Sequence, residues 1–161
     1  MARQLWFLRH GEAVPHAACL DADRALTDRG EQQSVTAGRA LRTMGVAFAH
    51  VFTSPKVRAR DTAALAAAEL GVAVITHPPL AQGFSRADAL ELAAAVGPDE
   101  RLLVVGHEPD FSQVLHDLTG ARVDFKKGGV AAVRLEGTTG GELIVLMRPR
   151  ELVAVAGAPD A

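Results

Sequence analysis

The sequence predicts an α/β fold, a single three-layer domain over residues 1–161 with a mixed, mostly parallel central sheet of about six strands flanked by helices. Short apolar runs alternate with longer segments of helical periodicity, which is typical of parallel strands joined by helices. Two later apolar runs flank a glycine-containing turn and predict an antiparallel hairpin that closes the sheet. The chain has 161 residues, of which 48% are hydrophobic, and both values suit one domain with a sizeable core.

Six short apolar runs are predicted to form the strands. They comprise residues 5–8, 51–53, 72–75, 102–105, 130–135 and 143–147, and the last two pair across residues 137–141. The run 5–8 ends abruptly at Arg9-His10-Gly11, and the run 102–105 ends at Gly106-His107. In parallel sheets, ligands bind beyond the carboxyl ends of the strands, so both histidines are expected to face one crevice.

Four helices are predicted from their capping residues and glycine stops. The first is expected over residues 28–44, capped by Thr27 or Asp28 with Glu31 in support. The other three are expected from Ser54-Pro55 to Leu70, from Ser85 to about Val96, and from Phe111 to Leu118. Residues 12–25 lack periodicity and are interpreted as a loop, and the apolar tail from Pro149 is left unassigned.

The formal net charge of −2 gives no reason to expect a nucleic-acid or membrane partner, although a basic groove can exist locally. Cys19 is the only cysteine, which excludes an intramolecular disulfide and argues against a cysteine-based zinc site. We interpret it as a loop or packing residue. The chain shows no secretory signal and no apolar run of the ~20 residues that span a bilayer, so a cytoplasmic location is expected.

The segment Arg9-His10-Gly11-Glu12 carries groups suited to phosphate chemistry. Arg9 can donate a planar fork of hydrogen bonds to a phosphate, and Gly11 leaves room for a ligand close to the backbone. A neutral imidazole is a nucleophile, and the reference pKa of ~6.5 makes that form of His10 available near neutral pH. Taken alone, the segment fits a solvated loop equally well.

Arg58 and His107 are the other candidate residues. Arg58 lies early on a predicted helix, where an anion is favoured, although a surface salt bridge is the simpler interpretation of this residue alone. Arg60 points elsewhere and is interpreted as a solvated charge. His107 alone fits a structural role, and its candidacy depends on the repeated placement of a histidine at a strand end. His16, His50, His77 and His116 are assigned structural or surface roles, since no pair has metal-site spacing.

Four motifs, in order and spacing, resemble the histidine phosphatase superfamily. They are Leu8-Arg9-His10-Gly11-Glu12, Leu26-Thr27-Asp28-Arg29-Gly30, Ser54-Pro55 with Arg58-Ala59 and Thr62-Ala63, and Gly106-His107-Glu108-Pro109. The short length and the stretch Lys126-Lys127-Gly128-Gly129 resemble the small bacterial phosphohistidine phosphatases. The resemblance implies a pocket in which His10 attacks phosphorus while Arg9, Arg58 and His107 hold the phosphoryl oxygens. Gly11 and Glu108 are further predicted substrate contacts, and no cofactor or metal is expected.

One departure from the family pattern bears on the substrate. Many superfamily members carry an acid shortly after the third strand that protonates the leaving group, and this chain offers Gln82 there. Glu12, Asp21, Asp88 and Glu108 remain alternative acids, and none is preferred. Because phosphohistidine needs little acid assistance, we expect the chain to hydrolyse phosphohistidine in a protein or a small phosphoramidate.

Two alternatives stay open. One is a phosphatase of broader range that acts on phosphoanhydrides or small phosphate esters, and the other is a phosphate-binding module without turnover. A mutase is less favoured, because superfamily mutases are usually longer. The expected partner is a phosphorylated protein or a small phosphorylated molecule, while the physiological substrate and the oligomeric state are left open.

Overall fold

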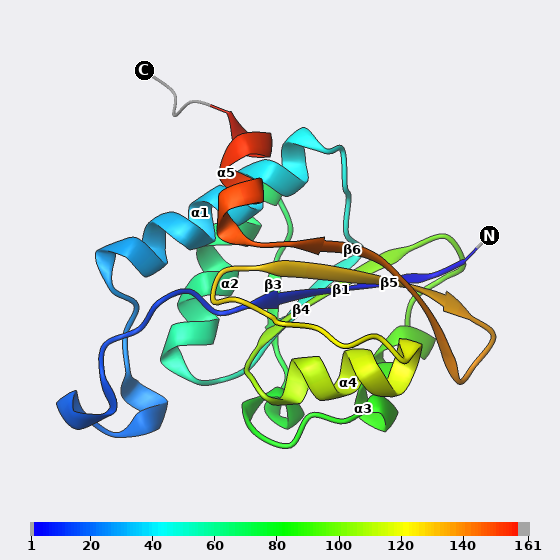
Figure 1. The fold of residues 1–161 in the computed structure, drawn as a ribbon, viewed down its shortest axis with the longest axis horizontal. Coiled ribbons are helices and arrows are strands. Elements are labelled where there is room, and N and C mark those ends of the chain that lie inside the picture. The colour runs from blue at the N-terminus through cyan, green and yellow to red at the C-terminus, as the bar shows by residue number, and fades with distance from the viewer. Residues whose placement is uncertain (1, 158–161) are drawn as a thin grey trace.

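The computed structural model describes residues 2–157, whose strands form one sheet in the order β3-β2-β4-β1-β5-β6 (Figure 1). The strands are β1 (Gln4–Arg9), β2 (His50–Thr53), β3 (Val74–Thr76), β4 (Arg101–Gly106), β5 (Val130–Glu136) and β6 (Gly140–Met147). Strands β1 to β4 run parallel, whereas β5 is antiparallel to both β1 and β6. This arrangement confirms the predicted α/β fold with a mixed, mostly parallel sheet and a closing hairpin.

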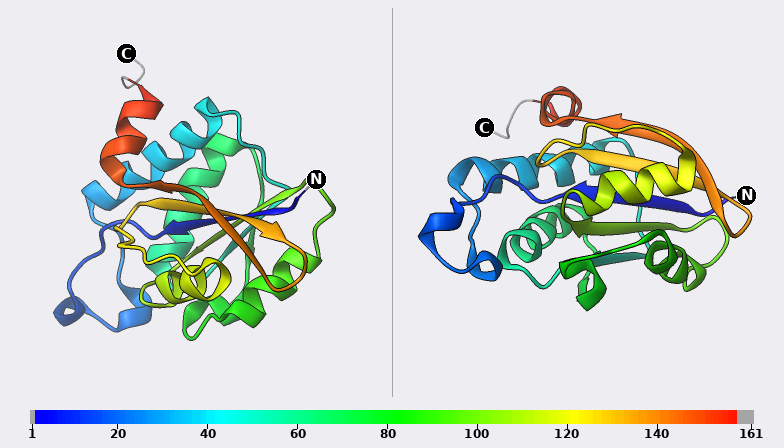
Figure 2. Two further views of the ribbon diagram at one scale, coloured as in Figure 1. Left: turned by 45° about the vertical axis from the view of Figure 1, so that its right-hand side comes forward. Right: turned by 60° about the horizontal axis from the view of Figure 1, so that its bottom comes forward.

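Five helices cover the two faces of the sheet (Figures 1 and 2). They are α1 (Asp28–Thr43), α2 (Val57–Leu70), α3 (Arg86–Ala94), α4 (Asp110–Thr119) and α5 (Pro149–Ala156). Side chains alternate along β1, so that Trp6 and Leu8 pack with α1, α2 and α5, while Leu5 and Phe7 pack with α3 and α4. The sheet is therefore buried on both faces, which explains the continuous apolar runs of β1 and β4.

Small residues let α1 and α2 approach each other closely. Ala37, Ala63 and Ala66 have no exposed surface, and a Cβ atom on Gly38 would lie 2.6 Å from the carbonyl oxygen of Ala66. Alanine and glycine therefore fill positions where a larger side chain would separate the helices. This close packing fixes the start of α2, which carries Arg58.

Three local expectations need correction. The tail from Pro149 contains α5, which buries Leu152 and packs on the face shared with α1; residues 158–161 of that tail lie outside the described residues. Helix α2 begins at Val57 rather than at Ser54-Pro55, because the backbone of the N-cap residue Lys56 is still extended, with φ −64° and ψ 138°. The α1 cap uses Thr27, which accepts a hydrogen bond from the Gly30 amide, and Glu31 takes no part in a capping box because it lies one position beyond Gly30.

The sheet register brings three strand ends together. Arg9 pairs with Gly106 and Thr53 pairs with Val105, so β1, β4 and β2 end at neighbouring positions. The His10 amide donates to the Gly106 carbonyl oxygen over 3.1 Å, which extends the β1–β4 ladder to the first histidine. No helix within residues 2–157 is long and apolar enough to cross a membrane.

Candidate active site

His10 lies directly after β1 and is 6% exposed. Its Nδ1 atom is 2.7 Å from the carbonyl oxygen of Gly11. A carbonyl oxygen can only accept, so Nδ1 must carry the proton that it donates. In the neutral ring the lone pair then lies on Nε2, and that nitrogen is the one available to attack an electrophile.

His107 occupies the matching position after β4, and its ring centroid is 5.2 Å from that of His10. Its Nε2 atom is 2.7 Å from Ser54 Oγ, which also accepts a hydrogen bond from the Lys56 amide over 3.2 Å. These contacts fit a Ser54 hydroxyl that donates to Nε2, which places the proton of neutral His107 on Nδ1; they also fit the opposite direction, because a serine oxygen can accept two hydrogen bonds. His107 Nδ1 is buried and has no hydrogen-bond partner within the protein.

Arg9 and Arg58 are held in fixed orientations by main-chain oxygens. Arg9 Nη1 donates to the Phe125 carbonyl oxygen over 2.7 Å, and Arg58 Nη1 donates to that of Asp21 over 2.8 Å. The Nε atoms of both arginines are buried and lack a hydrogen-bond partner within the protein. Each guanidinium group is thus oriented by its Nη atoms, while its Nε donor remains unused.

Asp21, in the loop after β1, links several of the cationic groups. Its carboxylate accepts from Lys56 Nζ over 3.0 Å, from Arg24 Nη1 over 3.1 Å and from Arg58 Nη2 over 3.3 Å. The hydrogen bond from Lys56, aided by the other cations, holds the pKa of Asp21 far below its usual range. The lowered pKa favours the ionised form of Asp21, which suits a positioning role.

The environment keeps both histidines neutral. Burial is the main cause that lowers the pKa of His10 to about 4, against a smaller opposing effect of the Gly11 carbonyl, and the nearby charges of Arg58, Arg9 and Lys127 lower it further. Burial and then the proximity of His10 lower the pKa of His107 to about 3. At neutral pH both rings are uncharged, so His10 has a free lone pair for nucleophilic attack.

The turn that carries His10 is held by close backbone packing. The Gly11 amide donates to Thr62 Oγ1 over 3.1 Å, and the Thr62 hydroxyl donates to the Arg58 carbonyl oxygen over 2.7 Å. A Cβ atom on Gly11 would lie 2.5 Å from the Gly30 carbonyl oxygen, and one on Gly30 would lie 2.0 Å from that of Glu12. Both polar backbone groups of Gly11 serve this turn, and its contact with substrate stays a prediction.

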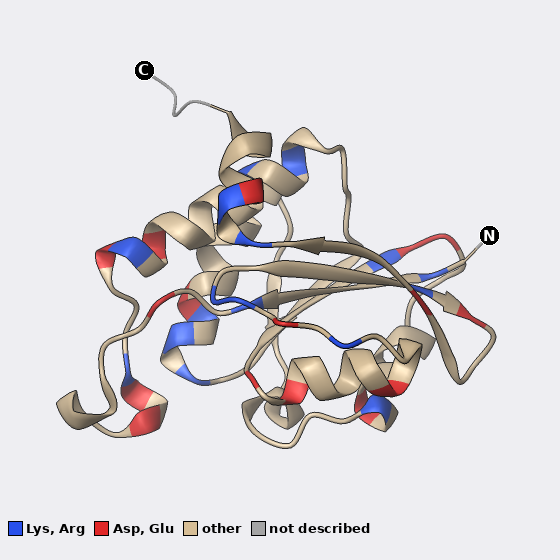
Figure 3. Ribbon diagram, viewed as in Figure 1, with Lys and Arg blue, Asp and Glu red and all other residues tan. Residues whose placement is uncertain are grey.

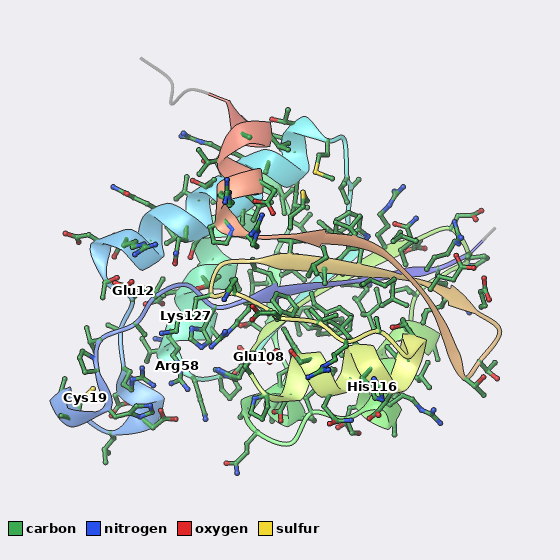
Figure 4. All side chains as sticks on the ribbon, viewed as in Figure 1. Glu12, Cys19, Arg58, Glu108, His116 and Lys127 are labelled. Carbon is green, nitrogen blue, oxygen red and sulfur yellow. The ribbon has the colours of Figure 1, made fainter. Side chains whose placement is uncertain are left out.

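Glu108 and Lys127 lie beside the pocket, and Figure 4 shows them with Arg58 beyond the same end of the sheet. The two carboxylate oxygens of Glu108 are 2.9 Å and 2.5 Å from the amide and the hydroxyl of Ser112. Glu108 is also close enough to Arg9 to stabilise its charge, which opposes the lowering of the Arg9 pKa by burial. Glu108 therefore supports Arg9, and its contact with substrate stays a prediction.

The candidate acids are engaged in other contacts. Glu12 Oε1 accepts from the Thr27 hydroxyl over 3.0 Å, and Asp88 closes the capping box of α3 with Ser85. Gln82 ends the 3-10 turn Pro78–Ala81, whose Leu80 side chain packs near Gly106. Within the described residues, each of the four candidate acids therefore has at least one hydrogen-bond partner.

The structure separates the remaining candidates from this pocket. Arg60 has a side chain 56% exposed and lies 3.8 Å from Asp61, as expected for a solvated charge. Cys19 is exposed in the loop after β1, and His116 lies on α4, at a distance from Arg58 in Figure 4. His16, 79% exposed, contacts Asp21 at the rim.

Several contributing residues were not identified from the sequence. The sequence places Ser54 in one of the family motifs and at the start of a predicted helix, but it does not indicate that the Ser54 hydroxyl contacts His107. Lys56 and Arg24 contribute through their contacts with Asp21. The signal available was the position of Ser54 and Lys56 directly after a parallel strand, on the edge that carries both histidines.

Comparisons with known proteins bear on the family and the fold of the chain. Residues 5–84 match the model of the histidine phosphatase superfamily, branch 1. An uncharacterized protein of a Picosynechococcus species is 35% identical over 167 residues, which cover 93% of this chain and 99% of that protein. The structure of a putative phosphohistidine phosphatase SixA from Nakamurella multipartitia superposes with a TM-score of 0.77 at 28% identity, covering 92% of this chain and 97% of that chain.

A structure of the protein histidine phosphatase SixA complexed with tungstate shows the same fold, with a TM-score of 0.77 at 24% identity and coverage of 93% of this chain and 99% of that chain. The family match includes β1, His10 and Arg58. By its sequence and its fold, this chain belongs to the histidine phosphatase superfamily, branch 1.

Proposed function

We propose that the protein is a phosphatase that hydrolyses phosphohistidine, in a protein or a small phosphoramidate, through a phosphorylated His10 intermediate. The observation that carries this proposal is a set of three unused donors. Arg9 Nε, Arg58 Nε and His107 Nδ1 are buried without a partner in the protein, and all three belong to the residues around His10. Unpaired buried donors are costly, so a group that offers acceptor oxygens to all three is favoured there.

A phosphoryl group has the chemistry that such donors recognise. Its transition state spreads charge over three equatorial oxygens, so catalysis depends mainly on positioning and on positive charge. The two guanidinium groups supply that charge, and the His107 Nδ1–H group adds a neutral donor. His10 Nε2, with its lone pair free, stands as the attacking atom.

The reaction then has two displacements on phosphorus. In the first, His10 Nε2 forms a bond to phosphorus as the bond between phosphorus and the substrate's imidazole nitrogen breaks. The leaving imidazole keeps the proton on its other nitrogen and departs neutral. In the second, a water oxygen attacks the phosphorylated His10, its proton passes to the phosphate, and His10 returns to its neutral form.

The preference for phosphohistidine over phosphate esters follows from the missing acid. An alkyl ester leaves as an alkoxide and gains about 10²–10⁴-fold from a positioned acid. Asp21 is held ionised by its cationic neighbours, Glu108 is engaged by Ser112, and Gln82 has no proton of suitable acidity. The likeness to the putative phosphohistidine phosphatase from Nakamurella multipartitia supports the same substrate class.

A comparison of substrates tests the proposal. We expect kcat/KM to be highest for a phosphohistidine peptide, lower for p-nitrophenyl phosphate and much lower for an alkyl phosphate, with all three activities lost in His10→Ala. Equal values for the peptide and the alkyl phosphate would contradict the proposed substrate class. Phosphate binding with no turnover of any of the three would instead support a binding module.

A further inference from the structure

A basic groove adjoins the pocket, with a volume of about 430 Å³. Six cationic side chains line it: Arg9, Arg29, Lys126, Lys127, Arg148 and Arg150. Glu12 is the one carboxylate among its lining residues in the described part of the chain. The groove thus holds six of the 17 lysines and arginines of a chain whose net charge is −2.

These cations come from four separate segments that the fold brings to one place, one of which is the end of β1 with Arg9. Figure 3 shows lysine and arginine at the beginning of α1, in the loop before β5 and at the beginning of α5. Acidic neighbours compensate part of this charge, since Arg148 Nε lies 2.7 Å from Glu151 and Lys126 Nζ lies 3.0 Å from Asp124. With Glu12, and with Glu108 beside Arg9, four carboxylates face six cations, so the groove stays positive.

The side chains of the groove are accessible to a ligand. Those of Arg29 and Arg150 are 73% and 77% exposed, and those of Lys126 and Arg148 are about half exposed. Their present ion pairs lie in water and are weak, so an incoming anion can compete for them.

The groove meets the candidate active site at Arg9. Arg9 lines the groove and also belongs to the pocket around His10. The Gly128 amide is 3.1 Å from both the Arg9 and the His10 carbonyl oxygens, which holds the loop of Lys126 and Lys127 against the pocket. A substrate with its phosphoryl group at His10 therefore extends past this loop toward Arg148 and Arg150.

We propose that the basic groove binds a second anionic group of the same substrate, adjacent to the phosphoryl group that His10 attacks. This inference rests on the proposed function for the placement of the phosphoryl group. The shared chemistry is a carboxylate or a second phosphate, and it has two sources: acidic side chains that flank phosphohistidine in a protein, or a further phosphate on a small molecule.

The test compares matched substrates in one enzyme. The first pair is a phosphohistidine peptide with acidic flanking residues and the same peptide with neutral ones. The second pair is a sugar bisphosphate and the corresponding monophosphate. In the unmodified enzyme we expect kcat/KM to be higher for the acidic member of at least one pair, mainly through KM, and the preference to shrink as salt is raised.

Substitutions in the groove then test whether its cations cause this preference for the acidic substrate. One exposed ion pair changes an equilibrium about 1.5- to 5-fold, so Lys126→Ala/Arg150→Ala should reduce the preference about three- to tenfold. Arg134→Ala is the matched control, because Arg134 is also exposed and ion-paired but lies beside Gln4, at the opposite end of β1 from His10. Circular dichroism checks that each variant is folded.

Each outcome decides the matter. A preference in the peptide pair that the double variant reduces assigns the groove to acidic protein segments, and one confined to the sugar pair assigns it to a second phosphate. No preference in either pair, or one that Arg134→Ala reduces equally, overturns the inference. If no phosphohistidine peptide is hydrolysed but the sugar bisphosphate is preferred over the monophosphate, the proposed function is wrong. The inference that the groove binds a second anionic group is then still supported.

Discussion

Replacing Arg58 tests whether the buried arginine, rather than its exposed neighbour, holds the phosphoryl group. Arg58 is 6% exposed and keeps its Nε donor unused, whereas the Arg60 side chain is 56% exposed and lies 3.8 Å from Asp61. Removal of one preorganised donor to a transition-state oxyanion costs about 10²–10³ in kcat. We expect Arg58→Ala to lose about that factor in kcat/KM, and Arg60→Ala to stay within about twofold, as for a typical surface change.

The assay measures kcat/KM with p-nitrophenyl phosphate and with a phosphohistidine peptide, alongside thermal unfolding of each variant. Arg58→Lys is a useful third variant, because it keeps the charge but loses the planar fork that also reaches the Asp21 carbonyl oxygen, and it should recover only part of the activity. Unfolding data separate a loss of fold from a loss of chemistry. Equal losses in Arg58→Ala and Arg60→Ala would refute the assignment of Arg58.

Three further predictions concern protonation, the leaving group and the backbone. The folded-state pKa of His10 (about 4) and that of His107 (about 3) lie below the ordinary 6.5, so the unfolded chain takes up protons first as the pH falls. The free energy of unfolding is therefore highest above pH 6.5 and decreases as the pH drops toward 3. An NMR titration that gives His10 a pKa near 6.5 would contradict this prediction. Gln82→Glu should accelerate single-turnover hydrolysis of alkyl phosphates selectively if the new carboxyl reaches the leaving oxygen, and a rate that is independent of leaving-group pKa in the unmodified enzyme would show that another acid acts. Gly30→Ala should destabilise the fold by about 1–3 kcal/mol, because its Cβ atom would lie 2.0 Å from the Glu12 carbonyl oxygen, and an unchanged melting temperature would argue against that packing.

The parts of the site that follow parallel strands could be predicted from the sequence. His10 and His107 each follow an apolar run that is buried in the sheet, and the rule for carboxyl ends of parallel strands places both at one edge. Their rings are 5.2 Å apart although nearly a hundred residues separate them in the chain. The pattern of strands in the sequence can therefore predict that residues far apart in the chain lie close together, provided that the strands before them are parallel neighbours in the sheet.

Contacts that depend on irregular segments could not be predicted. Asp21 lies in a loop without periodicity, so nothing in the sequence indicates that its carboxylate contacts Lys56 and Arg58. Helix α5 could not be assigned from the sequence because the tail from Pro149 is apolar but weakly patterned, and within the helix only Leu152 is buried. In both cases tertiary packing determines the structure, and local propensity alone does not.

The most direct test of the account is to locate the phosphate during turnover. The enzyme is mixed with excess substrate, quenched within milliseconds in alkali, which preserves phosphohistidine, and analysed by mass spectrometry, with 31P NMR to distinguish the two ring nitrogens. Because Nδ1 of His10 is committed to the Gly11 carbonyl oxygen, the account predicts phosphate on His10 and on its Nε2 atom. Phosphate on any other residue, or normal turnover by His10→Ala, would contradict it.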